Sequence, residues 1–217
     1  MPRILTVHSA APDDSVIKEA ARCIWDGGII IYPTETFYGM GALYSNEQAL
    51  TKLFRIKSRD FSKPVLLLIP DISSIEAVAS EVPPEAPVLA RHFWPGPLTL
   101  LLKPSPHLSS LLIGEDNTVG MRVSSDPVAS HLLAVLQDCI TSTSANLSGG
   151  ISPTAVHEIP GLLLDAVDLV IDAGTTPGGR PSTVFDVSCR PFKIVREGAV
   201  GVRDIMRVLH QSPDGAG

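Results

Sequence analysis

The sequence predicts a mixed α/β fold in a single domain. Short runs rich in β-branched residues alternate with amphipathic helical patterns, which favours a mixed domain over an all-α or all-β one. With 217 residues the chain is long enough for one large domain, and no internal repeat or linker divides it. Because 44% of the residues are hydrophobic and only 18% are charged, we expect a substantial core. We place the domain at 1–211 and expect the tail, 212–217, to be frayed.

In the first half of the chain, capping residues and glycines mark the helix ends. Asp13, Asp14 or Ser15 caps the first helix, and the pair Gly27 and Gly28 ends it. Continuous apolar runs bounded by turn residues indicate strands that are buried on both faces. Here we expect strands over 3–7, 28–32, 64–69 and 98–102, helices over 15–26, 47–57 and 83–94, and a polar loop over 33–41.

The second half continues the alternation and ends on a helix. A glycine-rich turn at 174–179 separates two groups of strands. In this half we expect strands over 118–123, 139–142, 168–172, 183–187 and 192–196, and helices over 126–137 and 202–210.

Composition argues against several classes of protein. The three cysteines are odd in number and far apart, which fits reduced thiols, and the six histidines form no HExxH pair or His/Cys cluster, so we expect no metal held by the protein. No apolar run reaches the roughly 18 residues of a membrane span, and the amino terminus does not have the pattern of a signal peptide. We therefore expect a soluble cytoplasmic protein. A net charge of −6 argues against general attraction to nucleic acid.

A polar segment at 141–150, here called the cradle, follows a predicted apolar helix. It contains five hydroxyls, the carboxamide of Asn146 and two glycines. These short groups on an adaptable backbone suit an anion or a small polar ligand. The same composition is also typical of an ordinary loop, so the segment alone leaves both interpretations open.

Three cations lie close together in sequence at Lys57, Arg59 and Lys63. Cations after a helix end stabilise its carboxyl terminus by roughly 0.3 to 1 kcal/mol, and no ligand is needed for that. The same residues would serve a phosphate site, with arginine as a bidentate fork and lysine as a point charge. The sequence contains no GxxxxGK[ST], GxGxxG or GxSxG segment, so neither a P-loop nor a dinucleotide fold nor a serine elbow is indicated.

Taken together, the motifs closely resemble those of the YrdC-like threonylcarbamoyl-AMP synthases, in family order over about 4–209. They are Tyr-Pro-Thr-Glu-Thr-Phe-Tyr-Gly-Met-Gly at 32–41, Lys-Ser-Arg at 57–59, Trp-Pro-Gly-Pro-Leu-Thr at 94–99, Thr-Val-Gly-Met-Arg-Val at 118–123, Ser-Ala-Asn-Leu-Ser-Gly at 144–149, Pro-Ser-Thr-Val at 181–184 and Arg-Glu-Gly at 196–198.

This resemblance implies a twisted open mixed sheet with flanking helices and a large concave cleft. It also implies a nucleotidyltransferase that condenses L-threonine, bicarbonate or carbon dioxide, and ATP into threonylcarbamoyl-AMP and pyrophosphate. The product would serve tRNA threonylcarbamoyladenosine formation, through a downstream threonylcarbamoyl-transferase complex. Mg2+ would be carried by ATP, and no membrane partner is implied.

The resemblance also assigns roles to residues. The signature Lys-x-Arg and Ser-x-Asn residues, expected to be catalytic, are Lys57, Arg59, Ser144 and Asn146. The expected threonine contacts are Thr36, Arg122, Ser142 and Ser182. The expected ATP contacts are Arg59, Lys63, Thr118, Ser144, Ser152 and Arg196.

Two positions depart from the family pattern, and other functions compete. Asp60 stands where many relatives have proline, and Leu68 where some have a threonine-contacting histidine. The chain stops soon after its last predicted helix, so we expect no extra carboxy-terminal domain. The alternatives are a paralogue without synthase activity, an RNA-binding module with weak RNA affinity, and a carbamoyl-transfer module.

Overall fold

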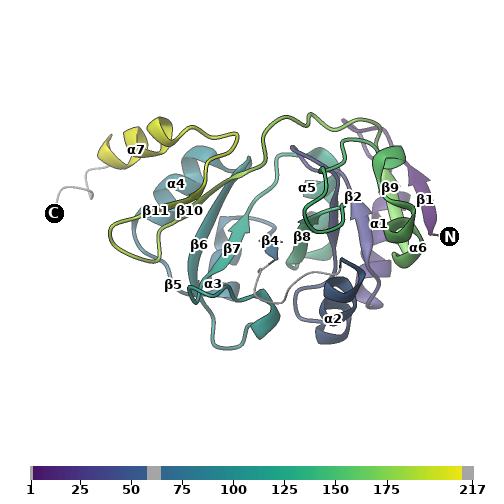
Figure 1. Cartoon of the computed structure of the whole chain (residues 1–217), viewed down its shortest axis with the longest axis horizontal. Coiled ribbons are helices and arrows are strands. Elements are labelled where there is room, and N and C mark those ends of the chain that lie inside the picture. The colour runs from purple at the N-terminus through teal and green to yellow at the C-terminus, as the bar shows by residue number, and fades with distance from the viewer. Residues whose placement is uncertain (1, 58–64, 212–217) are drawn as a thin grey trace.

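The computed structural model describes residues 2–57 and 65–211 (Figure 1). Each helix and strand that the sequence predicts has a counterpart there. The strands are β1 (Arg3–Thr6), β2 (Ile30–Tyr32), β3 (Gly39–Gly41), β4 (Leu66–Leu68), β5 (Ala79–Glu81), β6 (Leu98–Pro104), β7 (Val119–Arg122), β8 (Ile140–Ser144), β9 (Leu169–Asp172), β10 (Thr183–Asp186) and β11 (Lys193–Arg196). The α-helices are α1 (Asp14–Trp25), α2 (Glu47–Ile56), α3 (Ile75–Val78), α4 (Glu85–Phe93), α5 (Pro127–Leu136), α6 (Gly161–Ala166) and α7 (Val202–Gln211).

The strands form one mixed sheet across the described part of the chain. Its order is β1-β9-β2-β3-β8-β4-β7-β6-β10-β11, and β5 pairs with β6. It contains parallel pairs such as β4 with β7 and antiparallel pairs such as β3 with β8. Strands that are distant in sequence therefore lie side by side at the centre. In Figure 1 the amino-terminal strand β1 lies at one end of the sheet, and α4 and α7 lie at the other.

The core lies in two clusters because side chains alternate along each strand. Ile30 and Tyr32 of β2 pack with α1 and α5, whereas Ile31 packs into the larger cluster with α2. All three side chains are fully buried. The continuous apolar run thus forms a strand covered on both faces, as the sequence predicts. None of the described helices is long and apolar enough to cross a membrane.

Local signals set the helix starts. The side chain of Asp13 accepts a hydrogen bond from Ser15 N, and that of Asn46 accepts one from Ala49 N. Asp126 does the same for two amides at the start of α5. Each cap satisfies an amide that has no partner within its own helix, which typically contributes about 1 kcal/mol.

The main differences from the expectation are of three kinds. The segment expected as a polar loop over 33–41 contains β3, which pairs with β2 and β8. The expected strand at 139–142 extends to Ser144, so the first part of the cradle is sheet. The short elements α3, β5 and α6 were not predicted, because segments of three to six residues carry too little periodicity. The expected frayed tail lies outside the described residues.

Candidate active site

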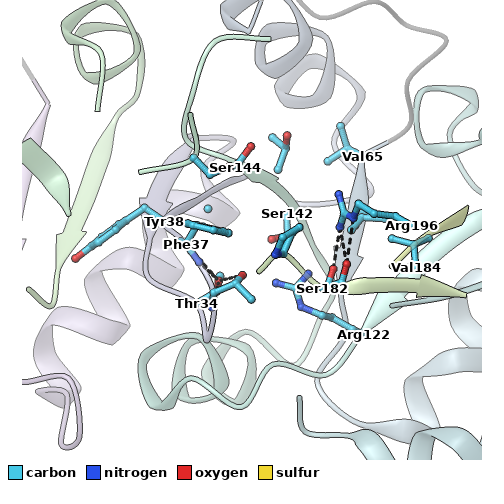
Figure 2. Close-up of a pocket in the computed structure, with 16 residues that line it drawn as sticks. Thr34, Phe37, Tyr38, Val65, Arg122, Ser142, Ser144, Ser182, Val184 and Arg196 are labelled. Carbon is cyan, nitrogen blue, oxygen red and sulfur yellow. Dashed lines mark hydrogen bonds between the residues drawn. The ribbon is translucent and has the colours of Figure 1, made fainter. Parts of the chain in front are cut away.

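A cavity of about 210 Å³ opens over the centre of the sheet (Figure 2). Its walls come from the β2–β3 loop, from β3, β4, β7 and β8, and from the carboxy-terminal strands β10 and β11. The lining residues are Thr34, Thr36, Phe37, Tyr38, Gly39, Val65, Leu66, Arg122, Ser142, Thr143, Ser144, Ser152, Pro181, Ser182, Val184 and Arg196.

Strand β8 brings two hydroxyls to the cavity. Ser142 and Ser144 are two residues apart, so both project from the same face of the strand. On the neighbouring strand β3, Gly39 pairs with Ser144, and a Cβ added at Gly39 would lie 3.4 Å from Ser142 Oγ. A side chain at this position would therefore lie in van der Waals contact with the serine hydroxyl.

Arg122 ends β7 and lies in the wall of the cavity, pointing inward (Figure 2). Its Nε lies 2.9 Å from Oε1 of Glu35, and both side chains are more than nine-tenths buried. Two residues earlier, an added Cβ at Gly120 would come within 2.5 Å of Leu66 Cδ2. The Gly-x-Arg pattern thus combines close packing against β4 with a cation at the strand end.

Arg196 of β11 also lines the cavity, and in Figure 2 Ser182 lies between it and Arg122. Its Nε and Nη2 donate to the main-chain oxygen of Ser182 at 3.1 and 2.9 Å, and Nη2 also donates to Ser182 Oγ at 3.1 Å. Burial, and then the charge of Arg122, lowers the pKa of Arg196. Arginine nevertheless stays protonated at neutral pH, so two guanidinium cations border one cavity. Thr99 holds the Ser182 hydroxyl from the other side at 3.0 Å.

The loop between β2 and β3 is a compact turn organised by Thr34. Its Oγ1 accepts from Thr36 N and Phe37 N at 3.2 and 3.3 Å and donates to Phe37 O at 2.7 Å. The main-chain oxygen of Thr36 accepts from Gly178 N at 2.7 Å, which fastens the loop to the glycine-rich turn. This turn holds Thr36 at the cavity wall.

The cradle is held from behind by Lys57. Its side chain is almost fully buried, and Nζ donates to the main-chain oxygens of Ser144 and Asn146, the latter at 2.8 Å. The Ser144 hydroxyl donates to Asn146 Oδ1 at 2.5 Å, and Asn146 Nδ2 donates to Gly150 O. Of the three signature residues that the structure describes, Lys57, Ser144 and Asn146, only Ser144 faces the cavity. Lys57 and Asn146 lie behind it and fix the chain that carries it.

The structure brings together seven of the side chains implied by the resemblance. They are Thr36, Arg122, Ser142, Ser144, Ser152, Ser182 and Arg196.

Other predicted positions lie elsewhere. Thr118 is buried at the opposite end of β7, about 13 Å from Arg122 at the usual rise of a strand, and does not line this cavity. Leu68 points away into the second core cluster. Arg59, Asp60 and Lys63 lie outside the described residues. The roles assigned to all these residues stay predictions.

Some residues in and behind the cavity wall were not expected from the sequence. Val65 and Leu66 supply an apolar wall, but an apolar run by itself indicates only a buried strand. Glu35 stands in the Thr-Glu-Thr motif, yet its contact with Arg122 joins residues 87 positions apart, and no local pattern predicts it.

The cavity is chemically suited to anions. Its described lining contains two arginines and several hydroxyls but no carboxylate. Guanidinium groups bind carboxylates and phosphates through paired, charge-assisted hydrogen bonds, and hydroxyls supply further donors. The described residues contain no group of three or more His, Cys, Asp or Glu side chains that could hold a metal ion.

Comparison with known proteins places this chain in a family. Residues 22–198 match the Sua5/YciO/YrdC family profile, described as "Telomere recombination". Threonylcarbamoyl-AMP synthase of Pyrococcus abyssi is 35% identical over 193 residues, which are 89% of this chain but only 57% of that protein. Threonylcarbamoyl-AMP synthase of Methylococcus capsulatus is 35% identical over 184 residues, 78% of this chain and 91% of that protein.

The fold agrees with the sequence comparison. The structure of P. abyssi Sua5 complexed with L-threonine superposes with a TM-score of 0.90 and 34% identity, over 94% of this chain and 60% of that one. The present chain thus spans little more than half the length of the P. abyssi relative. The mixed sheet, the matching profile and the identity over most of the chain show that this protein belongs to the Sua5/YciO/YrdC family.

Proposed function

We propose that the protein is an L-threonylcarbamoyladenylate synthase. One observation carries this proposal: a single cavity joins two guanidinium groups, Arg122 and Arg196, through a floor of serine hydroxyls. The two anionic reactants, an amino acid with its carboxylate and a nucleoside triphosphate, need two cationic groups close together. The names of the relatives, and the L-threonine bound in the P. abyssi structure, support this choice of reactants.

In the proposed arrangement, Arg122 binds the carboxylate of threonine, with Ser142 and Ser182 close by. Arg196, Ser144 and Ser152 bind phosphate oxygens of the nucleotide. Because Arg196 also donates to Ser182 Oγ at 3.1 Å, that serine touches both halves. The two reactants would meet beside it.

The proposed reaction depends on how the two reactants are positioned more than on a reactive side chain of the protein. The amine of threonine adds to carbon dioxide, forming an N–C bond and releasing a proton, which gives a carbamate. A carbamate oxygen then attacks the α-phosphorus as the bond to the pyrophosphate oxygen breaks. Holding both reactants in line and stabilising charge on the phosphate oxygens can carry such a displacement without a covalent enzyme intermediate.

Mg2+ fits this site as part of the nucleotide. The described lining contains no carboxylate, so phosphate oxygens and water would supply the ligands, which suits an ion that dehydrates reluctantly. When bound, the ion would neutralise phosphate charge. The protein itself would bind the two anions and hold their reacting atoms in line.

The test incubates the purified protein with Mg-ATP, L-threonine and labelled bicarbonate, and measures pyrophosphate and labelled adenylate. We expect both products, and both should require threonine. Arg122→Gln should raise the KM for threonine more than that for ATP, and Arg196→Gln should do the reverse. Arg180→Gln is the control, because this exposed arginine does not line the cavity.

Other outcomes would favour other functions. The synthase proposal fails if no threonine-dependent adenylate forms. Salt-sensitive tRNA binding without synthesis would indicate an RNA-binding module, because such binding weakens steeply as salt rises. Consumption of carbamoyl phosphate would instead indicate a carbamoyl-transfer module.

A further inference from the structure

Glu35 is a buried carboxylate that lies behind the cavity wall. It does not line the cavity itself, yet its Oε1 is 2.9 Å from Nε of Arg122, which does. A buried charge is costly unless it is paired and hydrogen-bonded. Oε1 is ion-paired with Arg122, and Oε2 accepts a hydrogen bond, so both carboxylate oxygens face a specific group.

The second oxygen of Glu35 is anchored to another element. Oε2 accepts a hydrogen bond from the hydroxyl of Ser124, and Ser124 Oγ also accepts from Asp126 N at 3.2 Å. Asp126 caps α5. The carboxylate is therefore fixed by the start of a helix on one side while it holds the guanidinium on the other.

This arrangement leaves the outer edge of Arg122 available. A guanidinium carries five N–H donors in one rigid plane, so fixing the Nε edge also fixes where the two Nη groups point. No described residue accepts a hydrogen bond from these Nη groups, and the N–H of Nε is not aligned on Oε1. Catalytic hydrogen bonds are often poorly aligned until the ligand is bound. In Figure 2 the guanidinium of Arg122 points into the cavity.

The two arginines differ in charge balance. Arg122 has the carboxylate of Glu35 beside it, whereas Arg196 pairs with no carboxylate among the described residues and donates only to Ser182. The charge of Arg122 is thus largely offset, and that of Arg196 is not. A singly charged carboxylate therefore suits Arg122, whose paired N–H donors match its shape. A polyanion suits Arg196, whose uncompensated charge attracts it more strongly.

We propose that Glu35 is a positioning residue that aligns Arg122 for a carboxylate ligand and directs the polyphosphate to Arg196. This inference rests on the proposed function, because it takes threonine as the carboxylate. It adds a residue that acts through Arg122 and touches neither reactant.

The experiment uses Glu35→Gln, which keeps the shape and an acceptor for Ser124 but removes the charge. Binding of L-threonine, L-threoninamide and ATP is measured by calorimetry with the full chain. We expect the Kd for threonine to rise at least tenfold, about 1.4 kcal/mol. The Kd for threoninamide, which lacks the carboxylate, should change less than twofold, and ATP should bind as well as before or more tightly.

Glu85→Gln provides a matched control. Glu85 is also buried and paired with an arginine, Arg190, but neither residue lines the cavity. This variant should leave the Kd for threonine unchanged. If Glu35→Gln does not fold, Ser124→Ala replaces it, because it frees one oxygen of Glu35 and keeps the charge. We expect it to raise the Kd for threonine about threefold, with ATP binding unchanged.

Two results would overturn the proposal. One is an unchanged Kd for threonine in folded Glu35→Gln, or in Ser124→Ala if that variant is needed. The other is an equal loss for threonine and threoninamide, which would indicate general distortion. The proposed function is tested separately on the wild type: if threonine binds in a Glu35-dependent manner but no adenylate forms, the synthase activity is refuted and the role of Glu35 is not.

Discussion

Replacing Lys57 with methionine removes the buried ammonium group that holds the cradle. Nζ donates to the main-chain oxygens of Ser144 and Asn146, and both acceptors lose that donor in the variant. Asn146 O is left without a partner among the described residues, which costs about 1 to 3 kcal/mol. Ser144 O keeps the hydrogen bond from Asn146 N at 2.8 Å and loses only the one from the ammonium, which contributes about 1.5 to 3 kcal/mol. The variant also avoids the cost of burying an ammonium, which offsets part of this loss. We therefore expect the free energy of unfolding to fall by about 2 to 4 kcal/mol.

Urea unfolding at neutral pH measures this change, and Lys52→Met is the matched control. Lys52 lies on the same helix, α2, but its pair with Asp168 at 2.9 Å is about half exposed. Such pairs contribute at most about 1 kcal/mol. Synthase turnover should fall in Lys57→Met alone, because Ser144 shifts with the cradle. A loss of stability no larger than that of Lys52→Met would refute the reasoning.

Two further substitutions test other parts of the site. Burial raises the pKa of the Tyr38 hydroxyl to about 12. The unfolded protein therefore loses this proton at lower pH than the folded one. As the pH rises from 10 to 12, the free energy of unfolding should fall by about 2 to 3 kcal/mol in total. Tyr38→Phe should remove that part of the alkaline decline in urea unfolding, and an unchanged slope would argue against it. Thr99→Val removes the hydroxyl 3.0 Å from Ser182 Oγ, and we expect the KM for threonine to rise about fivefold, or about 1 kcal/mol, at nearly constant Tm. An unaltered KM would show that Thr99 does not orient Ser182.

Features that depend on near neighbours in the chain could be read from the sequence. Asn46 caps α2 through Ala49 N at 3.0 Å, three residues away, and Asp126 caps α5 in the same way. The apolar run of β2 indicated a strand covered on both faces, which the two core clusters confirm. The strand β3 was missed because Gly39, Met40 and Gly41 have no strand pattern of their own and extend only by pairing with β2 and β8.

The candidate site was predicted as a set of motifs, but its internal arrangement was not. The resemblance implied the serines of the cradle and the two arginines that the cavity brings together. It did not imply that Lys57 would lie behind the cradle, nor that Thr118 would lie at the far end of β7. Both depend on which part of each strand or helix end meets the cavity, and that is fixed only when the sheet is assembled.

The sequence by itself determined the alternation of helices and strands, the caps and the motifs of the family, because each depends on residues a few positions apart. The tertiary structure alone decided that Glu35 faces Arg122 and that Arg196 holds Ser182. These contacts join segments brought together by the strand order β3-β8-β4-β7-β6-β10-β11. Local propensity does not encode that order. It follows from burying both faces of the sheet at once, which places separate polar segments around one cavity.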